Sequence, residues 1–138
     1  MKRAIFSVLA ALALGACQPA DAPLDGRWRV QQIAGASLGE GVDIWMTFDT
    51  VGQTVTGFTG CNDFTAPLNT FSGTLAIGAV TEQAGDCATM AAATDEQRFL
   101  LVLPRVQRQI LHGKSLELLQ AASGSETLIR LRREDGAD

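Results

Sequence analysis

Few residues in this chain have the types and spacing that chemistry on a substrate would need. Gly35-Ala-Ser37-Leu-Gly39 matches the G-x-S-x-G pattern, in which a sharp turn between a strand and a helix presents a nucleophilic serine. Here another glycine and a strand-like segment follow, so the required helix is missing. The single histidine, His112, is the candidate base, and it lies in a predicted hairpin turn. We therefore predict no catalytic residues and no enzymatic activity.

Residues that could bind a metal ion are equally sparse. The 138-residue chain has one histidine and three cysteines and contains no C-x-x-C pair. Zinc usually takes four closely spaced nitrogen or sulfur ligands. We expect no metal site and no cofactor.

A nucleic-acid partner is also disfavoured. The chain has 6% aromatic residues, no tyrosine and a formal charge of −4, which suits neither base stacking nor contact with phosphates. Near the C-terminus, Arg130, Arg132 and Arg133 could bind an anion or a lipid headgroup. Such arginines more often form the solvated face of an edge strand, where they discourage pairing with another sheet.

Residues 1–16 are typical of a secretory signal. The basic residues Lys2 and Arg3 precede the uncharged run Ala4–Ala16. A helix of that length rises about 20 Å, well short of the ~30 Å hydrocarbon core of a bilayer. The run ends in Leu14-Gly15-Ala16-Cys17, which resembles the lipobox of bacterial lipoproteins. The alternative is an ordinary secretory signal that happens to contain a cysteine.

The lipobox resemblance implies a lipid anchor at Cys17, which would become the mature N-terminus. Each acyl CH₂ contributes about 0.8 kcal/mol to membrane binding, so two or three chains give a stable anchor. Gln18, where an aspartate is associated with retention in the inner membrane, implies the outer membrane. Residues 17–25 would form the lipidated cysteine and a polar, proline-containing tether. We therefore expect the domain to face the periplasm.

Lipidation of Cys17 would leave Cys61 and Cys87 as the remaining thiols. Two cysteines in an oxidising compartment favour a disulfide. Closure of that loop would stabilise the fold by about 3–4 kcal/mol in the chain-entropy model. Two separate buried thiols are the alternative, because the sequence does not show whether the two Cα atoms approach each other.

Residues 26–134 form one predicted domain, followed by a polar tail at residues 135–138. Apolar and polar residues alternate along most of the domain, as they do in half-buried strands. His112-Gly113-Lys114 is expected to form the turn of a hairpin. The expected strands are Trp28–Ile33, Val42–Phe48, Thr54–Gly57, Phe71–Val80, Val106–Ile110, Leu116–Leu118 and Leu128–Leu131.

One segment has helical features instead. Thr94–Gln97 matches a capping box, Phe99 and Leu103 lie on an apolar face, and Pro104 ends the helix. We expect one α-helix at about Asp95–Leu103. Together with seven to eight short strands, it predicts a mainly β fold. The sheet is a small antiparallel β-barrel-like or strongly curved one, because closure hides its edges. We expect a monomer.

The most distinctive stretch is Thr56–Phe64, which reads T-G-F-T-G-C-N-D-F. Gly60 permits a positive φ, Asn62 can bond the local backbone, and Phe64 can anchor the segment in the core. With Cys61, these residues indicate a tight structural corner rather than a catalytic loop.

This corner and the strands around it resemble the META domain family, which includes HslJ-type bacterial heat-shock proteins. The resemblance implies a small, mainly β, barrel-like fold with one helix and a role in stress or envelope maintenance. It implies no catalytic residues, and it places Cys87 at the second family cysteine. The matching elements are Gly26–Val30, Val55–Gly57, Gly60–Phe64, Leu75–Ile77, Cys87, Glu96, Phe99–Leu100 and Leu116–Leu118.

Taken together, these features favour a non-enzymatic outer-membrane lipoprotein that helps the envelope to tolerate stress by binding an envelope protein or a small ligand. An inhibitor of a periplasmic protease or lysozyme is an alternative, with Glu82–Ala93 as its protruding loop. A small-ligand carrier is a second alternative, because a barrel of about eight strands can enclose one small molecule. A serine hydrolase ranks last.

Overall fold

The computed structural model describes residues 23–120 and 126–135 of the chain. The expected signal segment 1–16, the lipidation residue Cys17 and most of the tether lie outside the described residues. Within the described part, no helix combines the length and the apolar character needed to cross a bilayer.

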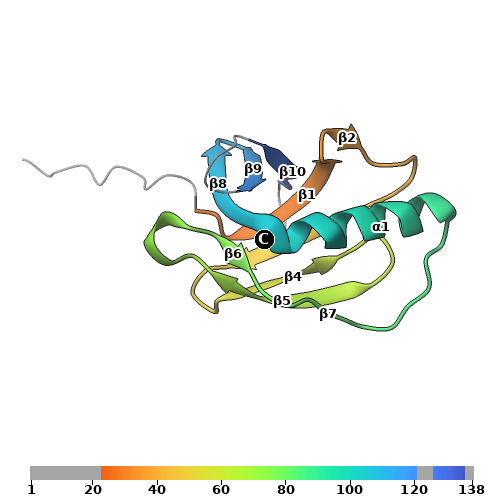
Figure 1. Ribbon diagram of the computed structural model, residues 1–138, viewed down its shortest axis with the longest axis horizontal. Helices are drawn as coiled ribbons and strands as arrows, with labels where there is room; N and C mark the ends of the chain where they lie inside the picture. Colours follow the sequence, from red (N-terminus) through yellow and green to blue (C-terminus); the bar gives the residue numbers. More distant parts are fainter. Residues whose placement is uncertain (1–22, 121–125, 136–138) are drawn as a thin grey trace, which may run out of the picture.

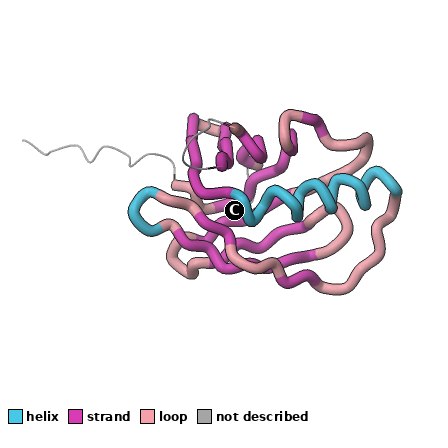
Figure 2. Tube along the Cα trace, in the orientation of Figure 1, coloured by secondary structure: helices cyan, strands magenta, loops and turns pink. Residues whose placement is uncertain are grey.

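Strands dominate the described residues, which also contain one α-helix and two short 3-10 helices (Figures 1 and 2). The elements in chain order are β1 (Gly26–Ile33), β2 (Ala36–Ser37), β3 (Trp45–Asp49), β4 (Thr54–Phe58), β5 (Asp63–Asn69), η1 (Phe71–Gly73), β6 (Ala76–Ile77), β7 (Thr81–Glu82), α1 (Met90–Val102), η2 (Leu103–Arg105), β8 (Val106–His112), β9 (Ser115–Gln120) and β10 (Thr127–Arg133).

The strands form one antiparallel sheet that nearly closes on itself. Its order is β6-β5-β4-β3-β1-β10-β9-β8, with β2 paired to β1 and β7 paired to β5. The two ends of this order approach each other beside β6, where the Leu75 N–H donates to the Gln107 carbonyl at 3.1 Å. The expected barrel-like, antiparallel fold with a single helix is therefore confirmed.

Side-chain alternation determines which residues fill the interior. In β1, Trp28 and Val30 are buried and Arg29 is exposed. A register shift between Val30 and Gln32 then changes the phase, so that Ile33 becomes the next fully buried residue. An extra residue of this kind bends a strand and increases its twist, which helps a small sheet to curve.

The expected strands at the two ends of the domain are found, but the middle differs. The segment expected at 42–48 becomes a strand only at Trp45, although Ile44 before it is buried and its carbonyl accepts from the Val30 N–H at 2.8 Å. The single strand expected at 71–80 is wrong, because η1 and β6 divide it. The pattern also missed β5, whose Pro67 is disfavoured in strands.

The helix begins earlier than expected. Thr89 is the N-cap residue, and its hydroxyl accepts from the Ala92 N–H at 3.1 Å. The capping box expected at Thr94 is therefore wrong, since the Thr94 hydroxyl lies one turn inside the helix and donates to the Met90 carbonyl at 3.0 Å. The expected end is confirmed, because α1 stops at Val102, just before Pro104.

The helix packs its apolar side against the interior face of the sheet. Phe99 is fully buried, and its ring meets the ring of Phe64 edge-on with centroids 5.7 Å apart. Val102 and Leu103 continue this buried side, whereas Leu101 on the opposite side is exposed. In Figure 1, α1 lies between the strands β1 and β8–β10 on one side and β4, β5 and β7 on the other.

Gly57 in β4 lies where the neighbouring strand and a buried ring leave no room for a side chain. A Cβ at this position would lie against the Trp45 carbonyl oxygen and 2.7 Å from Cε1 of Phe64. We predict that Gly57→Ala lowers the free energy of unfolding by about 2–3 kcal/mol, because backbone and a buried ring must both move. Urea denaturation measures this loss. Thr56→Ala, at an exposed neighbouring position, is the control, and an equal effect of the two changes would contradict the packing argument.

Candidate functional site

A disulfide joins Cys61, in the corner between β4 and β5, to Cys87, in the loop before α1. The Cα atoms are 4.4 Å apart, and the bridge spans 26 positions of sequence. The structure thus contains the bridge that the cysteine count favours, rather than two separate thiols. In the chain-entropy model, closure of such a loop stabilises the fold by about 3–4 kcal/mol. The bridge thus attaches the loop that precedes α1 to the β4–β5 corner.

Thr59 organises the corner from inside. It is fully buried, and its hydroxyl accepts from the N–H groups of Cys61 at 3.3 Å and Asn62 at 2.9 Å. The same hydroxyl donates to the Glu96 carboxylate of α1. One donor and two acceptor sites are all that a hydroxyl offers, so its bonding capacity is fully used. At Gly60, φ is +100°, a conformation that favours glycine.

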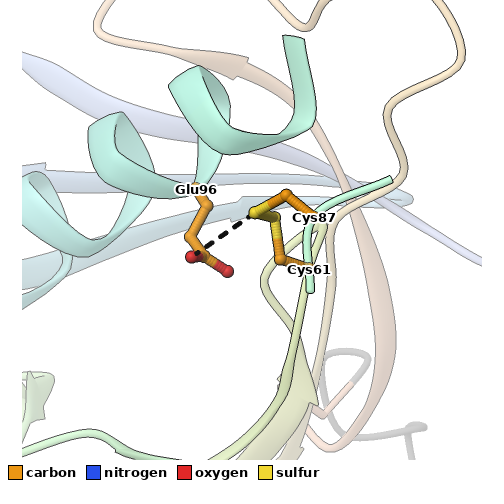
Figure 3. Close-up of side chains that lie close together, drawn as sticks. All are labelled: Cys61, Cys87 and Glu96. Atoms are coloured by element: carbon orange, nitrogen blue, oxygen red, sulfur yellow. Dashed lines mark hydrogen bonds between the residues drawn. A yellow bond between two sulfur atoms is a disulfide. The ribbon is translucent and has the colours of Figure 1, made fainter. Parts of the chain in front are cut away.

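Glu96 is the residue through which the helix holds the corner. Its Oε2 atom accepts from the Thr59 hydroxyl and from Nδ2 of Asn62 at 3.1 Å. Its Oε1 atom lies 4.0 Å from Sγ of Cys87, as Figure 3 shows. Because Cys87 carries no thiol proton in the disulfide, this last separation is a contact rather than a donated hydrogen bond. The corner, the loop and the helix therefore meet at one carboxylate.

The residues expected to form the corner are brought together, and two others join them. Gly60, Cys61 and Asn62 form the turn, and Phe64 anchors it in the core. Thr59 was missed because threonine is common in strands, although a hydroxyl three residues before Asn62 is typical of a local side-chain turn. The bracing role of Glu96 was also missed, because the sequence does not place α1 over the corner.

A second polar cluster attaches the segment between β1 and β3 to the helix. Asp95 is 3% exposed, and its carboxylate accepts from the Gly39 N–H at 2.6 Å and pairs with Arg98 at 2.6 Å. Arg98 also donates to the Ile33 carbonyl at 2.7 Å. These contacts hold the segment between β1 and β3 against α1, so their role is structural.

The serine and histidine considered from the sequence are not neighbours. Ser37 is exposed in β2, which pairs with β1, whereas His112 ends β8. Strands β1, β10 and β9 lie between them in the sheet order. As the sequence context indicated, the element that comes next after Ser37 is the strand β3 and not a helix.

The expectation that the C-terminal arginines lie on an edge strand is wrong. Strand β10 is central, between β1 and β9. Arg130 pairs with Glu117 at 2.7 Å, whereas the Arg133 guanidinium stacks on the Trp28 ring at 4.3 Å. Arg132 is exposed beside a shallow groove of about 270 Å³. A hydrogen bond and the charge of Lys114 lower the pKa of Asp135 at the rim of this face. Glu117 thus pairs with Arg130 and Asp135 with Lys114.

Comparisons with known proteins agree with this architecture. The META domain family model matches residues 22–135. No curated protein matches the chain. An NMR structure of a protein from Burkholderia xenovorans aligns with a TM-score of 0.64 and 19% identity, over 91% of this chain and 100% of that one. A second NMR structure aligns with a TM-score of 0.58 and 14% identity, over 78% and 87%. These two likenesses concern the fold.

The buried hydroxyl of Thr59 yields a direct test of the corner. We predict that Thr59→Val lowers the free energy of unfolding by about 2–3 kcal/mol, because the N–H groups of Cys61 and Asn62 lose their acceptor and the Glu96 carboxylate loses one of its two donors while the shape is kept. Thr56→Val, at an exposed position of the preceding strand β4, should change it by less than about 0.5 kcal/mol. Denaturant unfolding measures both values. Equal values would mean that the hydroxyl does not organise the corner.

Proposed function

The chain belongs to the META domain family, and we propose that it is a non-enzymatic lipoprotein of the bacterial outer membrane. In this proposal the domain faces the periplasm and supports tolerance of envelope stress through binding. The observation that carries it is the corner itself, where the side chains of Thr59, Asn62 and Glu96 bond one another and the local backbone. Polar groups used in this way favour a scaffold for binding over a reaction centre.

The first described residues of the domain support a short link to the anchor. The Leu24 side chain is buried, its carbonyl accepts from Nε1 of Trp28 at 2.8 Å, and Arg133 donates to the carbonyls of Pro23 and Asp25. Part of the segment expected as tether is thus bound to the domain. Residues 17–22 then remain as the link, and six residues span at most about 20 Å. Lipidation at Cys17 would therefore hold the domain close to the membrane surface.

The anchor is tested by metabolic labelling with palmitate in a bacterial host. We predict that the chain incorporates label and partitions with outer membranes, and that Cys17→Ser abolishes both. Cys87→Ser is the matched control, because it removes a cysteine from the folded domain and should leave labelling unchanged. Absence of label, or label that survives Cys17→Ser, would remove the anchoring proposal.

One observation favours a second candidate function, inhibition of a periplasmic protease or lysozyme. Between β7 and α1, residues 83–89 form a long loop that is exposed except at the half-buried Cys87 (Figure 1). The disulfide attaches this loop to the β4–β5 corner, and the Gln83 N–H donates to the Asp63 carbonyl at 2.9 Å. A constrained, protruding loop suits an inhibitor because little freedom is lost on binding. Its small side chains offer few anchors, so it stays the second candidate.

Capture from a solubilised outer-membrane fraction tests binding and separates the two candidates. We predict that the lipidated chain retains a reproducible envelope component, and that Thr59→Val, by loosening the corner, reduces the retained amount. If that component is a hydrolase whose activity the domain blocks, the inhibitor function is favoured. Retention of nothing beyond what an unrelated lipoprotein retains would contradict both.

A further inference from the structure

Three side chains with metal-binding atoms converge beside the disulfide. The ligand atoms of Cys61, Cys87 and Glu96 all lie within 4.8 Å of one another. Figure 3 shows that the three residues come from separate segments, namely the sheet corner, the loop before α1 and α1 itself. We propose that the reduced form of this protein binds a zinc ion through the two sulfurs and the Glu96 carboxylate.

The proposal requires reduction, because each sulfur of a disulfide lacks the thiolate charge that binds zinc. A dithiol reductant can supply the electrons by exchange, in which its own sulfurs form a disulfide and the Cys61–Cys87 bond breaks. Two electrons and two protons pass to the protein and give two thiols. Zinc then replaces the two thiol protons, which go to solvent, as two Zn–S bonds form.

The geometry is suited to a tetrahedral ion. With Zn–S near 2.3 Å and Zn–O near 2.1 Å, neighbouring ligand atoms lie roughly 3.6–3.8 Å apart. Oε1 of Glu96 is already 4.0 Å from Sγ of Cys87. The Cα separation of 4.4 Å lets rotation of the two side chains set the spacing between the sulfurs. Water would occupy the fourth position, as in open zinc sites.

Glu96 is oriented for this role before any metal arrives. Its Oε2 atom is held by Thr59 and Asn62, which leaves Oε1 directed at the sulfurs. Fixed outer contacts of this kind tune a metal ligand. No ion pair to Glu96 is present within the described residues, so a divalent cation would offset two of the three negative charges that Glu96 and the two thiolates carry. Cys87 and Glu96 are half-buried, which lets an ion reach them.

The test uses residues 17–138 with Cys17→Ser, so that the two domain cysteines are the only thiols. One sample is oxidised, and the other is reduced with a phosphine, since a dithiol would itself bind zinc. Zinc affinity is measured by competition with a chromophoric chelator, and cobalt(II) reports thiolate coordination through its charge-transfer absorption. Circular dichroism confirms that the reduced chain and its variants keep their strands and helix.

We expect one equivalent of zinc in the reduced protein and none in the oxidised protein. Glu96→Gln should weaken binding at least about tenfold. Asp63→Asn, an exposed acid in the same corner, should leave it unchanged. Absence of binding after reduction would overturn the proposal. So would binding that Glu96→Gln does not alter, whether to a folded or an unfolded chain, because Glu96 would then only brace the corner.

Discussion

The bond from the buried Thr59 hydroxyl to the Glu96 carboxylate joins the sheet to its helix. A small sheet that nearly closes must fill its interior, and here α1 supplies much of that filling through Phe99 and Val102. These side chains fill the interior only if the helix is held at a fixed position over the strands. Glu96 secures its middle to the β4–β5 corner, and the Asp95–Arg98 pair secures it to the segment after β1. Two neighbouring acids on one helix thus bind two different segments of the strand framework.

This arrangement explains why the most distinctive sequence of the chain is structural. Thr59, Asn62 and Glu96 direct their polar atoms at one another, and Gly60 supplies the backbone conformation that the turn needs. A binding surface is therefore expected on the exposed segments that this corner holds in place. The loop at residues 83–89 is the clearest of these, since the disulfide attaches it to the corner while its other residues are exposed.

The same three residues connect stability with redox state. When oxidised, Cys61 and Cys87 restrict the conformations open to the unfolded chain and attach the loop to the corner. When reduced, they would leave two thiols beside a carboxylate whose second oxygen is already bonded. Zinc would replace one cross-link by another and keep the loop in place. In this proposal Glu96 stays in place in both states, because Thr59 and Asn62 hold its carboxylate and neither bond involves a sulfur.

The sequence by itself determined much of the local structure. Alternation located β1, β3, β4 and the β8–β9 hairpin, Pro104 marked the end of the helix, and the glycine-containing corner was recognised from its residue types. It also identified the META family from the order of these elements. Such features depend on neighbouring residues, whose steric and hydrogen-bonding preferences are expressed locally.

Only the tertiary structure decided the remainder. Thr89 and Thr94 are both able to cap a helix, and a start at Thr89 places Asp95 inside the helix, where it is buried and bonds the distant Gly39 N–H. Strand β5 forms despite Pro67 because every residue of β4 pairs with a residue of β5. The placement of Arg130 on a central strand and the meeting of Cys61, Cys87 and Glu96 depend on contacts between residues far apart in the chain. Such contacts follow from the closure of the sheet, which no local pattern encodes.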